Sequence, residues 1–184
     1  LSKENPSNEN KYAYLTALQG IGDFKKALIL VDELLSKYPK NLILNITKSE
    51  IYLLAQELDK AKIQIERVLK ISPGNYPASI IKSNILSAQN KTIQAEEIVR
   101  ELLISKNNDP HLWMLLSEIQ RSGKNILGYH LSRGEYYLLL GDLENALNQF
   151  QFALRLSSNS FQTSETIMTK IKYAQDRLGQ KRGL

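Results

Sequence analysis

The sequence predicts an all-α solenoid of stacked two-helix repeats, and three observations support this prediction. Alanines recur at an interval of 34 residues, at Ala27, Ala61 and Ala95. The segments around them follow the period of amphipathic helices, and no segment has the strict alternation of a half-buried strand. Pro39 and Pro73 fall between successive units, where proline ends one helix or begins the next. A fixed period of this length is typical of a stack of helical hairpins.

The elements can be placed in order along the chain. Residues 1–10 are polar and read as a linker. Glycine and aspartate at Gly22-Asp23 and again at Gly141-Asp142 predict tight turns that cap the next helix. The expected helices are 11–20, 24–37, 42–55, 58–71, 76–89, 92–105, 110–122, 125–140, 143–156 and 161–178.

The repeat interval slips once. The next equivalent alanine after Ala95 is Ala146, 51 residues on, which is one and a half units. Only three helices fit between Trp113 and Ala146, so the helix at 125–140 must close one unit and open the next. Its apolar side chains surround most of its circumference, as a helix with two partners requires. We expect repeats over 11–158, as units 11–37, 42–71, 76–105, 110–140 and 125–156, and a capping helix with a basic tail over 159–184.

Composition restricts the classes of function. The chain has 184 residues, a formal net charge of +5 and no cysteine. Lysines and arginines are interspersed with acids, which argues against a nucleic-acid-binding surface. No apolar run approaches the ~18 residues that span a bilayer, so we expect no membrane insertion. Because the sequence begins at Leu1, we expect it to be a fragment or a processed form.

Small residues mark the crossing of the two helices in each unit and carry a family resemblance. The small residues on the first helices are Ser49, Ser83, Ser117 and Gly134. With the alanines, Tyr52, Val68, Pro73, Trp113, Tyr137 and Phe150, they resemble the tetratricopeptide-repeat (TPR) pattern. Gln120 departs from this pattern, because an aromatic residue is usual at its place. The resemblance implies a protein-binding, non-catalytic role.

A narrower resemblance is carried by the C-terminal half and covers about 11–178. The segments Asp109–Ser117, Ser132–Tyr137 and Gly141–Ala146 look like the C-terminal repeat region of periplasmic zinc metallopeptidases of the β-barrel assembly-enhancing family. That resemblance implies a peptidase domain with an HExxH motif before Leu1, and zinc in that domain only. It also implies a periplasmic location and outer-membrane β-barrel assembly components, or their clients, as partners.

No catalytic or metal-binding constellation is visible within these residues. The only histidines are His111 and His130, whereas zinc sites need three or four converging ligands. Adjacent acids such as Glu96-Glu97 point about 100° apart on a helix and do not face one substrate. We therefore predict no enzyme activity and no cofactor in this segment.

The predicted binding surface is a groove lined by the first helix of each unit. Its mixture of apolar and polar side chains suits an extended or helical peptide. The lysine–asparagine clamp by which some TPR proteins hold a terminal carboxylate is absent, since Ile46, Glu50, Ile80 and Asn84 occupy its places. The predicted groove residues are Tyr12, Thr16, Ile46, Glu50, Leu53, Ile80, Asn84, Ser87, Met114, Glu118, Arg121, Leu131, Glu135 and Leu138.

Two other functions remain open at this point. A free-standing scaffold, such as a pilus-assembly or lipoprotein-type adaptor, would have a similar array. An RNA-associated helical repeat would need a basic stripe along one wall of the groove.

Overall fold

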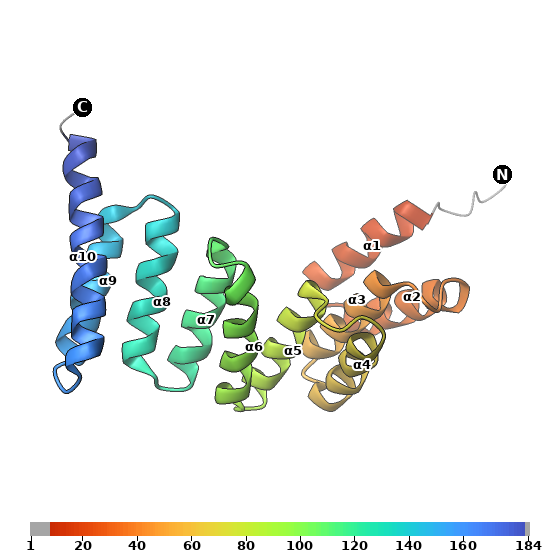
Figure 1. Cartoon of the computed structure of the whole chain (residues 1–184). Coiled ribbons are helices and arrows are strands. Elements are labelled where there is room, and N and C mark those ends of the chain that lie inside the picture. Colours follow the sequence, from red (N-terminus) through yellow and green to blue (C-terminus); the bar gives the residue numbers. More distant parts are fainter. Residues whose placement is uncertain (1–7, 183–184) are drawn as a thin grey trace. The chain divides into compact units, whose positions relative to one another are not determined.

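The computed structural model describes residues 8–182, which form ten α-helices without a strand in that range (Figure 1). The predicted all-α repeat fold is confirmed. The helices are α1 (Asn8–Gly20), α2 (Phe24–Lys37), α3 (Leu42–Leu54), α4 (Leu58–Ile71), α5 (Tyr76–Ala88), α6 (Thr92–Ser105), α7 (Pro110–Ser122), α8 (Ile126–Leu139), α9 (Leu143–Leu156) and α10 (Phe161–Arg182).

The two ends of the chain differ from the sequence prediction. Helix α1 begins at Asn8, so residues 8–10 of the expected linker are helical, while 1–7 lie outside the described residues. Helix α10 continues to Arg182, four residues beyond the expected end at 178. Polar residues such as those of 8–10 have helix propensities close enough to neutral that a neighbouring helix can extend through them.

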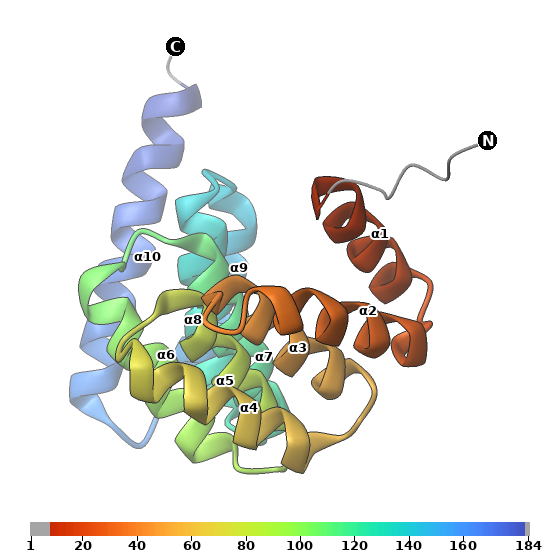
Figure 2. The ribbon, with the colours of Figure 1, turned by 90° about the vertical axis from the view of Figure 1, so that its right-hand side faces the viewer.

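The chain divides into two compact units, Leu1–Gln89 and Asn90–Leu184. In the first unit, successive helices from α1 to α5 pack against one another, and α3 also contacts α5 (Figure 2). The small residues lie at the helix crossings, as predicted. Ala61 is fully buried, and the Ser49 hydroxyl donates to its carbonyl oxygen at 2.8 Å.

In the second unit, α8 packs against both α7 and α9, so it is shared between two pairs (Figure 1). Helix α10 packs along α9 and contributes Ile167, which is fully buried, to a core with Ala146 and Phe150. The crossing of α8 and α9 needs Gly134, because a Cβ there would lie 2.2 Å from the Phe150 ring.

The turns explain why α8 has two partners. Within a pair, the turn residue has a left-handed conformation, at Gly22, Gln56, Asn90 and Lys124, each 34 residues after the last. The next such turn is at Gly141, only 17 residues after Lys124. The amides that follow these last two residues donate to the helices before them in the same pattern: Asn125 N to Gln120 O at 2.8 Å and Asp142 N to Tyr137 O at 3.0 Å.

Connections between pairs have a different geometry. There the residue before the next helix donates to the carbonyl three residues back instead of five, from Asn41 to Tyr38 at 3.0 Å and from Asp109 to Lys106 at 3.1 Å. Helix α8 is therefore entered by a within-pair turn and left by another, instead of by one turn of each kind. This repeated turn type is the structural form of the half-unit slip.

Candidate functional site

None of the predicted groove residues is fully buried. Tyr12, Thr16 and Arg121 are exposed. The partly buried ones are Ile46, Glu50, Leu53, Ile80, Asn84, Ser87, Met114, Glu118, Leu131, Glu135 and Leu138. The structure thus leaves every one of these residues at least partly accessible.

In the first unit, some of the predicted groove residues also contact neighbouring helices. Ile46 and Leu53 pack against the apolar cluster of α4 and α5. Glu50 accepts a hydrogen bond from Gln19 of α1 at 3.4 Å. A hollow of about 550 Å³ lies nearby, lined by Tyr12, Ala13, Leu34, Tyr38, Asn41, Ile43 and Leu44. Only Tyr12 of this lining belongs to the predicted groove.

In the second unit, the predicted residues of α7 and α8 do not share a face. Met114 contacts Arg133 of α8, whose Nη1 lies 2.7 Å from the Met114 sulfur. Leu131 and Glu135, each two residues from Arg133, point about 200° away from it on the helix. Met114 therefore lies on the side of α8 opposite Leu131 and Glu135, and the groove that was expected to include all three residues stays a prediction.

Leu131 and Glu135 instead line a cavity of about 390 Å³ within the second unit. Helix α10 supplies one wall, and α6, α7 and α8 supply the others. Glu135 forms an ion pair with Lys170 of α10, and its side chain is only 15% exposed. The remaining lining residues are Arg100, Trp113, Gln120, Gly128, Ser132, Gln162, Thr163, Thr166 and Ile167.

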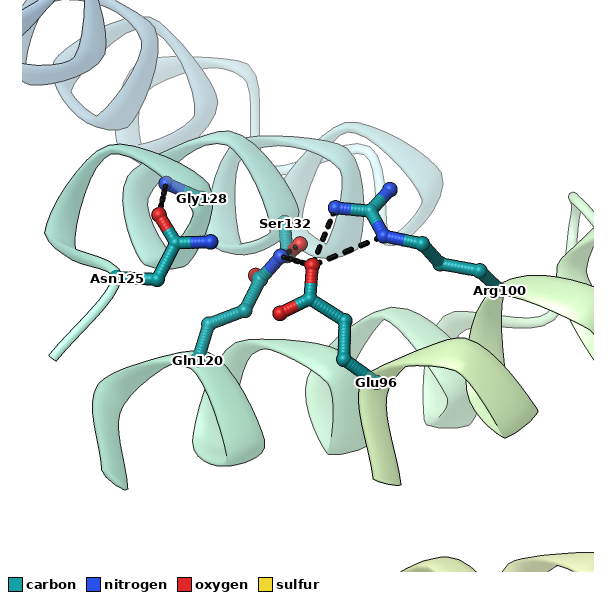
Figure 3. A network of polar contacts seen from close by, with 6 residues as sticks. All are labelled: Glu96, Arg100, Gln120, Asn125, Gly128 and Ser132. Carbon is teal, nitrogen blue, oxygen red and sulfur yellow. Dashed lines mark hydrogen bonds and ion pairs between the residues drawn. The ribbon is translucent and has the colours of Figure 1, made fainter. Parts of the chain in front are cut away.

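A hydrogen-bond network forms the polar wall of this cavity (Figure 3). Gln120, 1% exposed, donates from Nε2 to Glu96 Oε1 at 3.0 Å and accepts from the Ser132 hydroxyl at 2.7 Å. Arg100 also donates to Glu96 Oε1, from Nε at 2.9 Å and Nη2 at 2.6 Å. The polar residue at the place of the usual aromatic thus joins α6, α7 and α8, and both functions of its amide are satisfied.

Gly128 provides the space for this network. A Cβ at this position would lie 2.7 Å from Gln120 Nε2 and 2.6 Å from Asn125 Nδ2. Asn125 caps α8 by accepting from the Gly128 amide at 3.0 Å. The turn, the glycine and the buried amide therefore constrain one another at the start of α8.

The two histidines are not among the residues that line the cavity. His130 lies 2.8 Å from Gln149 Oε1 through Nδ1 and stacks on Phe152 with ring centroids 5.1 Å apart, so it serves the α8–α9 contact. His111 is exposed. No group of three or more metal-ligating side chains occurs within the described range.

The resolved pKa shifts fall on the surface of the first unit. Hydrogen bonds from the Lys26 side chain and amide hold the pKa of Asp23 below its ordinary value. A hydrogen bond from Lys11 lowers the pKa of Glu33, and these two groups are 2.6 Å apart. Both are effects of ion pairing at exposed carboxylates.

Sequence reasoning found only part of the cavity. Leu131 and Glu135 were predicted, and Gln120 was recognised as a departure from the repeat pattern. Ser132, Arg100 and the residues of α10 were missed. A buried glutamine at a usually aromatic position, followed by Gly128 and Ser132 at small-residue spacing, was the signal that could have indicated a polar wall.

The fold is similar to solved TPR structures. A MamA structure from Desulfovibrio magneticus RS-1 matches with 12% identity and a TM-score of 0.62, over 94% of this chain and 95% of that one. A TPR protein from Parabacteroides merdae has 16% identity and a TM-score of 0.57, with 90% and 70% covered. TTC0263, a thermophilic TPR protein of Thermus thermophilus, has 14% identity and a TM-score of 0.55, with 89% and 98% covered.

These similarities establish the architecture as that of TPR proteins. No protein-family profile and no curated protein matches the sequence. Within residues 8–182, no helix has the length and apolarity that crossing a bilayer would need.

Proposed function

We propose that this chain is a non-catalytic scaffold that binds segments of other proteins, and that the cavity of the second unit receives side chains of the partner. The cavity carries this proposal. Its volume of about 390 Å³ is near the lower end of the ~300–1,000 Å³ of ligand pockets, so it suits one or a few side chains.

The chemistry of the lining favours a neutral, largely apolar guest. Leu131 and Ile167 offer apolar surface, and Trp113 adds an aromatic side chain. The charged lining groups are already paired, Glu135 with Lys170 and Arg100 with Glu96. The Thr166 hydroxyl of α10 donates to Gln162 O at 3.0 Å and keeps lone pairs that can accept from a backbone amide of a bound segment.

Two threonines of α10 allow a matched test. Thr166 and Thr169 are both exposed, and each hydroxyl donates to the carbonyl four residues back, at 3.0 Å. Only Thr166 lines the cavity. Peptides selected from a displayed random library on the full chain would be measured by fluorescence polarisation against Thr166→Trp and Thr169→Trp.

We expect Thr166→Trp to raise the Kd at least ~10-fold by filling the cavity, and Thr169→Trp to change it less than ~2-fold. Equal binding by both variants would remove the cavity from the proposal. Failure of the chain to select any peptide would contradict the scaffold role itself. A helical CD spectrum of both variants is the control for folding.

We further propose the specific setting that the C-terminal segments suggest: a periplasmic TPR domain that docks a zinc metallopeptidase onto outer-membrane assembly components or their clients. The support is the resemblance of Asp109–Ser117, Ser132–Tyr137 and Gly141–Ala146. In this setting zinc belongs to a separate peptidase domain, and the present segment holds no cofactor. An HExxH motif encoded upstream of Leu1 is the expected result, whereas a lipobox-like cysteine there would favour the free-standing adaptor.

The absence of activity is a separate expectation. The pure chain should cleave neither casein nor peptides, with or without added zinc. Chelator-sensitive cleavage would overturn it. RNA binding is the remaining alternative, and a gel shift that weakens with salt would be required to support it.

A further inference from the structure

The α7–α8 pair holds a second group of side chains, on the face of α8 opposite the cavity. Arg133 is its centre. Its Nη1 lies 2.7 Å from the Met114 sulfur, and Nη2 donates to the Tyr137 hydroxyl at 2.7 Å. The guanidinium also lies over two rings, with 4.9 Å to the Tyr137 centroid and 5.4 Å to that of Tyr136.

The positive charge of Arg133 is not matched within this group. Arg133 forms no ion pair with any carboxylate in the described part of the chain, and its Nε is buried without an acceptor. A thioether and a phenol are weak acceptors for a guanidinium. Buried or half-buried charges in proteins are ordinarily paired, because removing an unpaired charge from water is costly.

The neighbouring charges of the same unit make the contrast clear. Arg100 is paired with Glu96, Arg121 with Glu118, and Lys170 with Glu135. Arg133 is more buried than Arg100 and Arg121 and yet has no such partner. Arg133 is partly exposed as a residue while its Nε is buried, so a carboxylate from outside the chain would have to approach the Nη groups.

We propose that Arg133, flanked by Met114, Tyr136 and Tyr137, is a receptor for a single aspartate or glutamate side chain of a protein partner. This proposal rests on the scaffold function above and specifies the chemistry of one contact. A carboxylate would form charge-assisted hydrogen bonds with Arg133 in an environment from which the rings and the thioether exclude water.

The surroundings favour a carboxylate that is carried by a peptide. The aromatic and thioether side chains beside the guanidinium suit an apolar residue next to the acid in the same peptide.

The test is differential selection from a displayed random heptapeptide library. Peptides retained by the full chain and not by Arg133→Met would be sequenced, and each would be synthesised with its acidic residue and with the matching amide. Arg133→Met keeps an unbranched apolar side chain against the tyrosines. Arg155→Met is the matched control, since Arg155 also lies over an aromatic ring, that of Phe152, at 4.4 Å.

We expect the selected peptides to share an acidic residue beside an apolar one. Arg133→Met and the acid-to-amide change should each raise the Kd at least ~10-fold, and the combination should add little more, since both remove the same contact. Arg155→Met should leave the Kd within ~2-fold. Arg133→Lys should recover only part of the affinity, because an ammonium lacks the planar fork of donors.

Three results would overturn the carboxylate receptor. If Arg133→Met retains every peptide that the full chain retains, the scaffold function stands and this contact is removed. Binding that depends on Arg133 and not on an acidic residue would show that the side chain acts through packing. Arg133-dependent binding of single-stranded RNA or of anionic phospholipid vesicles, in place of acidic peptides, would assign the site to another class of partner.

Discussion

The α3–α4 pair and the α7–α8–α9 trio solve the same packing problem in different ways. In the pair, a serine at the crossing bonds to the facing backbone, from Ser49 Oγ to Ala61 O at 2.8 Å. In the trio, the crossing of α8 and α9 has Gly134 against the ring of Phe150. The facing residue is Ile65 in the ordinary pair and Phe150 in the trio, both fully buried. At this crossing, the helix with two partners therefore packs a glycine against the larger side chain of the facing helix.

The largest effect should come from making the trio like the pair at this crossing. Gly134→Ser should lower the free energy of unfolding by about 3 kcal/mol, because its Cβ would overlap the Phe150 ring. Ser49→Gly should cost about 1–2 kcal/mol, from helix propensity and one lost hydrogen bond. Urea titrations followed by CD measure both. The double variant Gly134→Ser with Phe150→Ile should recover part of the loss; no recovery would mean that the overlap with Phe150 is not the cause.

The next effect concerns the residue at the usually aromatic place, where α3 has Tyr52 and α7 has Gln120. Gln120→Leu should destabilise by about 2 kcal/mol, because the buried Ser132 hydroxyl loses its acceptor and Glu96 loses one donor. Adding Ser132→Ala removes the unsatisfied hydroxyl and should restore most of that loss. The same thermal and urea measurements decide it, and a double variant less stable than Gln120→Leu would contradict the network.

A smaller effect concerns the left-handed turn position, which is occupied by glycine in some turns and by a residue with a Cβ in others. Gln56 and Lys124 have φ values of 60° and 59°, which cost a residue with a Cβ about 1 kcal/mol relative to glycine. Gln56→Gly and Lys124→Gly should each stabilise the chain by up to about 1 kcal/mol. Gly141→Ala, at φ 74°, should destabilise it by a similar amount. Midpoints of thermal unfolding measure all three. If the change to glycine raised the midpoint at one of Gln56 and Lys124 and lowered it at the other, the turns of the pair and the trio would differ in backbone strain.

The smallest effect is a pH dependence at the turn before α2. The pKa of Asp23 lies below its ordinary 3.8 in the folded chain, through its bonds to Lys26, so the unfolded chain binds the proton first. Its contribution to stability is complete above pH 3.8 and is lost as the pH falls below that value. The unfolding midpoint of wild type should therefore fall slightly more steeply with acid than that of Asp23→Asn. If the unfolding midpoints of the two proteins fall in parallel as the pH is lowered, the contribution of Asp23 is ruled out.

The fold was predictable because its signals are local. Small residues at 34-residue intervals, the slip before Ala146 and the apolar circumference of 125–140 together indicated the order of the helices and the shared helix. The ends were less predictable, since neither the start at Asn8 nor the extension to Arg182 has a strong stop or start signal.

The candidate sites were predictable only in part, because they depend on which helices meet. Leu131 and Glu135 follow from the repeat register of α8 alone. The cavity also needs α10 and Arg100 of α6, which no short-range pattern connects. Met114 was predicted, but its contact with Arg133 was not. That contact depends on which face of α8 is turned toward α7, and this is set by the turn at Lys124.

The repeated turn also bears on how many guests such a chain can hold. Because the turn at Gly141 repeats the geometry of the one at Lys124 after half a unit, the two proposed binding sites lie on different sides of α8, with Leu131 at one and Arg133 at the other. Two segments of one partner held there would not compete for space, and binding of one would raise the effective concentration of the other. The 17-residue offset would in this way allow one helix to bind partner segments on two of its sides.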